Sequence, residues 1–172
     1  MARTLQSATV VSVMPAMGKS FIAKKFPTRV RDLESSEYHW KMDPKTKEFI
    51  LDENGNKIAN EKWPMNYIEA IKNLEKSGLY EAVLVSSHED IRKLMAKNGI
   101  KYANIYPLDQ ADIKAELLTR CIQRHSTGKF IDDYNTNFSN YVRSMKYDKG
   151  SVVNLGVDLK SLELWETWLF QR

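Results

Sequence analysis

Short apolar, β-branched runs alternate with amphipathic segments along the whole chain. The runs predict strands at 8–13, 28–33, 81–86, 102–106 and 152–155. The spacing of apolar residues between them predicts helices at 21–26, 35–40, 64–77, 87–98, 112–124, 132–146 and 159–170. Strands that alternate with helices are typical of a parallel sheet covered on both faces, so the sequence predicts an α/β fold.

Length and composition limit the range of function classes. The 172 residues suffice for one domain with a sizeable core. The single cysteine, Cys121, excludes an internal disulfide, and the three histidines lack the spacing of zinc ligands. The apolar runs are too short for a membrane span or a signal peptide, so we expect a cytoplasmic protein without a membrane partner. The formal charge of +4 suits an anionic ligand such as a nucleotide, but is too small to predict strong binding of duplex nucleic acid.

The sequence Gly18-Lys19-Ser20 directly follows the turn after the first predicted strand and opens the first predicted helix. Strand, turn, Gly-Lys-Ser and helix is the context of a phosphate-binding P-loop. In such a loop, backbone N–H groups at the helix N-terminus converge on phosphate oxygens. Lys19 would then reach the β- and γ-phosphates, and Ser20 would hold Mg²⁺. We expect the ATP-binding residues to be Ala16, Met17, Gly18, Lys19, Ser20 and Phe21.

The motif is incomplete, because Val13 stands where the full pattern has glycine and Ala16 where many such loops have glycine. Two other interpretations therefore stay open. One is a plain strand–turn–helix with a solvated Lys19. The other is a loop that binds nucleotide but no longer catalyses.

A carboxylate is also needed, because phosphoryl transfer depends on positioning and on charge neutralisation. Asp32, at the end of the second predicted strand, is the candidate for holding Mg²⁺ with Ser20 or for accepting a proton, with Glu34 behind it. No aspartate stands at the end of the third predicted strand, where the chain reads Leu84-Val85-Ser86-Ser87. The alternative for Asp32 is a helix cap.

Arg120 and Arg124 are four residues apart, on one face of a predicted helix that precedes Gly128. This is where a closing lid, at residues 120–135, would place arginines over the transferring phosphoryl group. A solvated basic helix end is the alternative.

Three blocks, at residues 31–40, 63–68 and 83–88, resemble the phage-encoded P-loop nucleotide kinases related to nucleoside monophosphate (adenylate-type) kinases. Those proteins carry Asp-x-Asp/Glu-Ser-Ser-x-Tyr/Phe-x-Trp, a Pro-x-Asn-Tyr-Ile helix and a strand ending in Ser-Ser-His. The resemblance implies a P-loop NTPase three-layer sandwich of about five strands, in one domain over residues 1–172 with a small lid. It implies transfer of the γ-phosphoryl of ATP, with Mg²⁺, to a nucleoside or deoxynucleoside monophosphate in the cytoplasm, that of the host if the protein is phage-encoded.

The same resemblance places the acceptor pocket at Asp32, Ser35, Ser36, Tyr38, Trp40 and His88. Tyr38 and Trp40 could stack on a base or belong to the core. His88 could contact the acceptor or be a polar residue in the first turn of a helix. An excursion at residues 43–62, with a hairpin turn at Asn54-Gly55, is longer than the family pattern predicts.

Two further functions stay open. One is a kinase that acts on a polynucleotide 5′ end or on a modified base. The other is a catalytically eroded protein that binds nucleotide or a partner protein, an interpretation that the incomplete loop favours.

Overall fold

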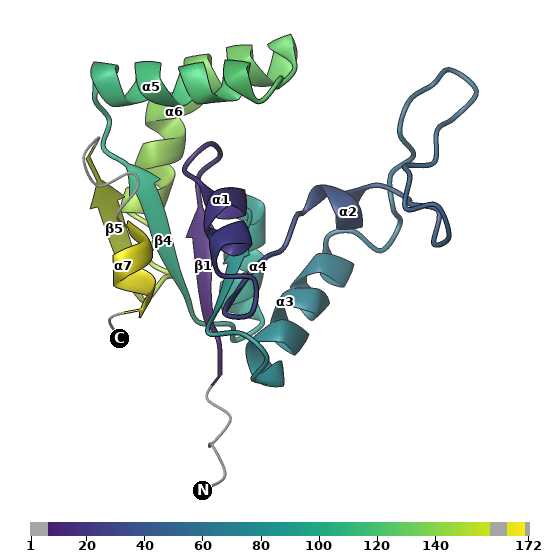
Figure 1. Cartoon of the computed structure of the whole chain (residues 1–172), viewed down its shortest axis with the longest axis horizontal. Coiled ribbons are helices and arrows are strands. Elements are labelled where there is room, and N and C mark those ends of the chain that lie inside the picture. The colour runs from purple at the N-terminus through teal and green to yellow at the C-terminus, as the bar shows by residue number, and fades with distance from the viewer. Residues whose placement is uncertain (1–6, 159–164, 171–172) are drawn as a thin grey trace, which may run out of the picture.

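The computed structural model describes residues 7–158 and 165–170. Its strands form one five-stranded, all-parallel sheet in the order β2-β3-β1-β4-β5 (Figure 1). The strands are β1 (Thr9–Val13), β2 (Val30–Asp32), β3 (Ala82–Val85), β4 (Tyr102–Pro107) and β5 (Val153–Val157). The helices are α1 (Lys19–Lys25), α2 (Ser36–His39), α3 (Met65–Ser77), α4 (Glu89–Lys97), α5 (Ala111–Gln123), α6 (Gly128–Lys146) and α7 (Trp165–Phe170). The predicted α/β class with a parallel sheet is confirmed.

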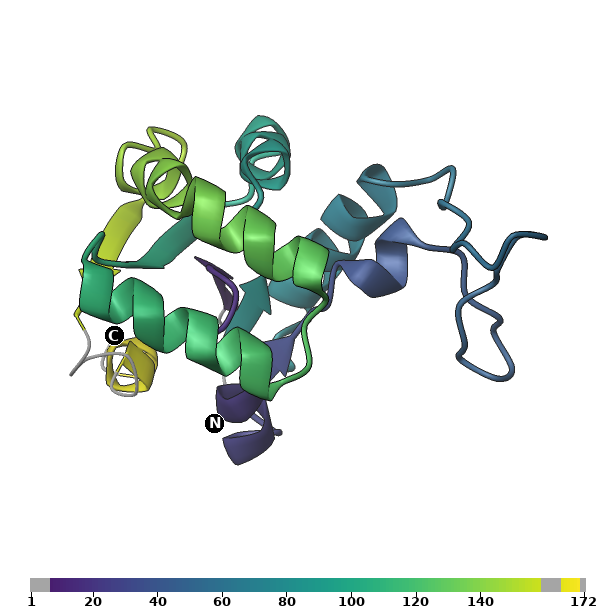
Figure 2. The ribbon, with the colours of Figure 1, turned by 90° about the horizontal axis from the view of Figure 1, so that it is seen from above.

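Strand β1 lies at the centre of the sheet, between β3 and β4. One hydrophobic cluster packs α1, α5, α6 and α7 against the sheet, and a second packs α3 and α4 against it. The chain leaves β1 toward β2 and leaves β4 toward β5, so the loops after these neighbouring strands diverge. Such a divergence opens a crevice at the carboxyl ends of the strands. Helix α5 and the first part of α6 lie across this edge (Figures 1 and 2).

Helix α6 begins earlier than the sequence pattern predicts. The predicted start was residue 132, whereas the helix begins at Gly128 because the Thr127 hydroxyl accepts a hydrogen bond from the N–H of Phe130 and caps it. The connection between α5 and α6 is therefore a tight turn. The predicted terminal helix at 159–170 corresponds to α7 over residues 165–170, and residues 159–164 lie outside the described residues.

Residues 41–62, which we call the arm, project away from the sheet (Figure 1). Isolated antiparallel bridges pair Met42 with Phe49 and Leu51 with Lys57. At its tip the Asp52 carboxylate accepts hydrogen bonds from two backbone N–H groups, and Gly55 has a φ of 79°. At the base of the arm, the ring of His39 stacks between those of Trp40 and Trp63, with ring centroids 4.3 and 4.7 Å away.

The Tyr67 hydroxyl joins the ends of β2 and β3. It donates to the carbonyl of Leu33 at 2.7 Å and accepts from the N–H of Ser86 at 3.1 Å, and the Tyr67 side chain is fully buried. A buried backbone group without a partner is costly, so this hydroxyl stabilises both segments.

We expect Tyr67→Phe to lower the free energy of unfolding by about 1–3 kcal/mol, because it leaves the Leu33 carbonyl and the Ser86 N–H unpaired in the core. Urea denaturation followed by circular dichroism measures the change. Tyr147→Phe is the control, since Tyr147 is 67% exposed, and it should change the stability by less than about 0.5 kcal/mol. Equal effects of the two substitutions would contradict the role of Tyr67.

Candidate functional site

A cleft of about 1210 Å³ lies at the carboxyl edge of the sheet. Its floor comes from the β1–α1 loop (residues 14–18) and from α1. One side, the α5 wall, consists of Glu116, Arg120, Gln123, Arg124 and, from α6, Phe130. Another side, the β2–β3 wall, consists of Glu34, Ser35, Ser86, Ser87 and His88. The cleft thus collects residues from elements that are far apart in the sequence.

The β1–α1 loop uses left-handed backbone angles at Ala16 (φ 66°) and Gly18 (φ 93°). Val13 needs no such angle, because it is still part of β1 and lies in register with Ile105. This explains how the loop forms without a glycine at that position. At Ala16 the left-handed angle costs about 1–2 kcal/mol, a strain that the surrounding contacts must offset.

Two side chains of the α5–α6 pair hold this loop by its carbonyl groups. The Tyr134 hydroxyl, on α6, donates to the Pro15 carbonyl at 3.0 Å. The Arg120 Nη1 donates to the Ala16 carbonyl at 3.5 Å, and the Arg120 Nε pairs with Glu116 at 3.1 Å. Helices α5 and α6 are therefore attached to the loop that precedes Lys19.

Lys19 and Ser20 form the first turn of α1 and line the cleft. The Ser20 hydroxyl donates to Oδ2 of Asp32 at 3.0 Å. Asp32 is the last residue of β2, whereas the N-cap position of α2 is Ser35, so Asp32 is not a helix cap. Its Oδ1 is buried and has no hydrogen-bond partner among the described residues.

The ionisable groups beside Lys19 have shifted pKa values. Burial and then the negative charge of Asp32 raise the pKa of Glu34, and the charge of Lys19 partly opposes this. Partial desolvation and then Lys19 lower the pKa of His88. His88 occupies the N-cap position of α4, but its side chain makes no capping hydrogen bond.

The structure brings some of the predicted acceptor residues to the cleft and places others outside its lining. Ser35 and His88 line it. Asp32 and Ser36 do not, although Asp32 accepts a hydrogen bond from Ser20 and Ser36 lies next to Ser35 at the start of α2. Tyr38 packs against Tyr67, with ring centroids 5.4 Å apart, and Trp40 stacks on His39.

The predicted nucleotide-binding residues 16–21 and both predicted arginines line the cleft. Phe21 is 66% exposed there. Arg124 contacts the Ser126 hydroxyl at 3.2 Å and lies over the Phe130 ring. Ser86 and Ser87, at the end of β3 beside His88, also line the cleft. The sequence pattern did not single out the lining residues Lys25, Glu116, Gln123 and Phe130. Helical spacing could have found Glu116, which lies four residues before Arg120.

Among residues 7–158 and 165–170, no group of three or more histidine, cysteine, aspartate or glutamate side chains could hold a metal ion. The pair of Ser20 and Asp32 nevertheless fits Mg²⁺, which prefers oxygen ligands, keeps several waters and uses one or two carboxylates together with substrate phosphates. The unpartnered Oδ1 of Asp32 supplies a suitable oxygen. None of the described helices combines the length and the apolar character needed to cross a bilayer.

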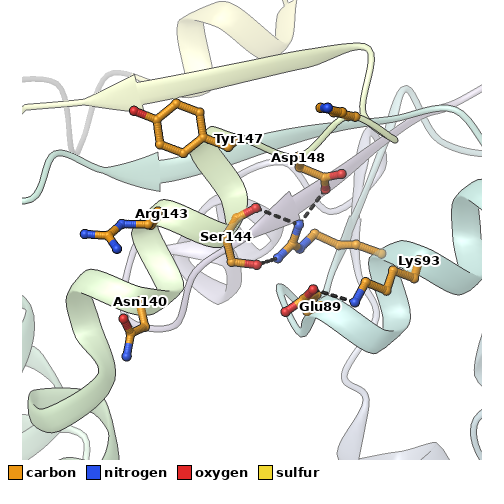
Figure 3. Close-up of a pocket in the computed structure, with 9 residues that line it drawn as sticks. Glu89, Lys93, Asn140, Arg143, Ser144, Tyr147 and Asp148 are labelled. Carbon is orange, nitrogen blue, oxygen red and sulfur yellow. Dashed lines mark hydrogen bonds and ion pairs between the residues drawn. The ribbon is translucent and has the colours of Figure 1, made fainter.

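A smaller groove of about 450 Å³ lies between α4 and α6 (Figure 3). At its base Arg92, which is 3% exposed, donates to the Ser144 carbonyl and hydroxyl and to the Asp148 carboxylate. The Arg92 Nε also donates to the Ser87 carbonyl at 3.0 Å. Arg92 therefore connects Ser87, in the β2–β3 wall of the cleft, to Ser144 on α6.

No protein-family model matches the chain. A search among curated proteins finds no match. Among solved structures, the chain is similar to the crystal structure of an uncharacterized protein from Eubacterium ventriosum, with 10% identity and a TM-score of 0.42. That match covers 95% of this chain and 99% of the other.

We expect Lys19→Met to raise the pKa of His88, because it removes a positive charge that disfavours the imidazolium. An NMR titration of the His88 ring protons measures the shift. Lys24→Met is the matched control, since Lys24 lies on the same helix but does not line the cleft, and it should leave the titration unchanged. If Lys19→Met also leaves it unchanged, Lys19 and His88 do not share the cleft.

Proposed function

We propose that the chain is an ATP-dependent phosphotransferase of the nucleotide kinase type, with the β1–α1 loop as its P-loop. The observation that carries the proposal is that Lys19, Ser20, Arg120 and Arg124 line one cleft, and that Ser20 donates a hydrogen bond to Asp32, which lies outside the lining. These groups supply the positive charge and the metal ligands that phosphoryl transfer needs. The central strand, loop and helix that carry Gly18-Lys19-Ser20 have the order of a P-loop unit.

In this proposal each group has a separate task. Lys19 contacts the β- and γ-phosphates, while Ser20 and Asp32 hold Mg²⁺. When bound by Ser20 and Asp32, Mg²⁺ would neutralise charge on the phosphates. Arg120 and Arg124 stabilise the charge on the transferring phosphoryl group. The long bond from Arg120 to the Ala16 carbonyl, at 3.5 Å, is weak enough to be exchanged for a phosphate oxygen.

Two classes of acceptor are compatible with this donor arrangement. The resemblance to the nucleoside monophosphate kinases implies a nucleoside or deoxynucleoside monophosphate. A polynucleotide 5′ end or a modified base instead presents a hydroxyl group. Release of ADP from ATP, screened against acceptors of both classes, tests the proposal. Binding of ATP without ADP release with any acceptor would identify a catalytically eroded protein.

We expect Lys19→Ala to lower the rate of ADP release by roughly 10²–10³, because it removes a charge contact to the transferring group. Steady-state kinetics at saturating ATP measures the change, and thermal unfolding checks that the fold is intact. Lys24→Ala is the control on the same helix. An unchanged rate for Lys19→Ala would reject the P-loop assignment.

We expect Asp32→Asn to lower kcat by about two orders of magnitude, while Tm and ATP affinity stay close to those of the wild type. Asparagine keeps an oxygen that can accept from Ser20, so the substitution removes the charge and little else. Single-turnover kinetics and calorimetric titration with ATP give the two quantities. Near-normal turnover of Asp32→Asn would exclude Asp32 from metal binding and from the chemistry.

A further inference from the structure

The cationic side chains that line the cleft come from α1 and α5. They are Lys19, Lys25, Arg120 and Arg124. The β2–β3 wall contributes Glu34, three serines and His88, and no described arginine or lysine. The cleft therefore has a cationic side, suited to the phosphates of ATP, and a side that offers hydroxyl, carboxylate and imidazole groups.

Three other arginines are absent from the lining of the cleft. The Arg29 Nε pairs with Glu81 at 2.6 Å, where Glu81 precedes β3 at the opposite edge of the sheet. Arg92 is buried behind the wall in its contacts with Ser144 and Asp148. Arg31 lies in β2 directly before Asp32, in register with Val83. None of these guanidinium groups is among the residues that line the cleft.

The charges closest to the β2–β3 wall are mostly negative. Asp32 and Glu37 act on Glu34, and Asp90 and Asp133 act on His88. Lys19 is the cation that acts on both, and in the proposed function it contacts the donor phosphates. Sites that bind a phosphate monoester typically use arginine, which matches the phosphate oxygens in a bidentate way. A second phosphate dianion at this wall would meet carboxylates instead.

A neutral hydroxyl group fits the same wall. Serine hydroxyls and a carboxylate can hydrogen-bond to the hydroxyl groups of a sugar, and Glu34, Ser35, Ser86 and Ser87 offer these groups at the wall. The half-buried rings of Tyr38, His39 and Trp40 follow Ser35 and Ser36 in the chain but do not line the cleft.

We propose that the acceptor is the 5′-hydroxyl of a nucleoside unit, either a free nucleoside or the 5′ end of a nucleic acid, and that Glu34 receives its proton. The inference rests on the proposed transfer from ATP. In the step, the 5′-oxygen forms a bond to the γ-phosphorus, and the bond from the γ-phosphorus to the β–γ bridging oxygen breaks. The hydroxyl proton passes to the Glu34 carboxylate, and ADP leaves.

The test offers the wild-type chain ATP and Mg²⁺ with matched acceptors: each nucleoside and its 5′-monophosphate, and one oligonucleotide with and without a 5′-phosphate. We expect ADP release and phosphorylated product with the hydroxyl member of a pair, at a kcat/KM at least tenfold above that of the phosphorylated member. Turnover with nucleosides would identify a free nucleoside as the acceptor, and turnover with the oligonucleotide would identify the 5′ end of a nucleic acid. Turnover with monophosphates alone would overturn the inference and leave the proposed function standing. No ADP release with either class would overturn the proposed function, and the inference with it.

Glu34→Gln tests the proton acceptor. We expect kcat with the hydroxyl acceptor to fall by roughly 10²–10⁴ with the KM for ATP unchanged, because general-base catalysis is lost while the donor side is intact. The preference for hydroxyl over phosphorylated acceptors should also shrink, because a negative charge has left the wall; a purely structural residue would not change this ratio. Glu69→Gln, at an exposed position of α3 outside the cleft lining, is the matched control. Equal kcat values for Glu34→Gln and Glu69→Gln would exclude Glu34 as the proton acceptor.

Discussion

The position of the whole cleft depends on the central strand β1. Its residues lie in register with β3 on one side and β4 on the other, and four of its five side chains are buried. A strand paired on both edges cannot shift without breaking two ladders of hydrogen bonds. The loop that follows it therefore leaves the sheet at a defined point, and Ser20 meets Asp32 because β2 ends at the same edge.

The two walls of the cleft are held in different ways. Polar contacts fix the β2–β3 wall: the Ser12 hydroxyl donates to the Ser86 carbonyl at 3.1 Å, and Tyr67 and Arg92 hold the segments on either side. Apolar packing between α5 and α6, through side chains such as Leu117 and Phe138, joins the other wall into one unit. That unit reaches the β1–α1 loop through the hydrogen bonds of Tyr134 and Arg120. A wall with few polar attachments is the one better suited to move when a ligand binds.

Periodicity and turn residues were enough to predict the strands and the α/β class, because those signals are local. The start of α6 was missed because the cap at Thr127 lies in a polar stretch that reads equally well as a loop. The division of charge in the cleft could not be predicted either, since it depends on Arg29 meeting Glu81 and Arg92 meeting Asp148, pairs 52 and 56 residues apart. The stacking of Trp40 could not be predicted for the same reason. Its ring stacks on that of its neighbour His39, and the His39 ring also stacks on Trp63, which lies 24 residues further along the chain.

The stacked rings at the base of the arm have a practical consequence for engineering. Because His39, Trp40 and Trp63 close the arm where it leaves the domain, the closure does not depend on what lies at the tip. Lengthening a closed surface loop costs little, roughly 0.6 kcal/mol for each doubling of its length. The exposed turn at residues 53–55 is therefore a natural insertion point for an epitope, a fluorophore or a second domain that leaves both walls of the cleft unchanged.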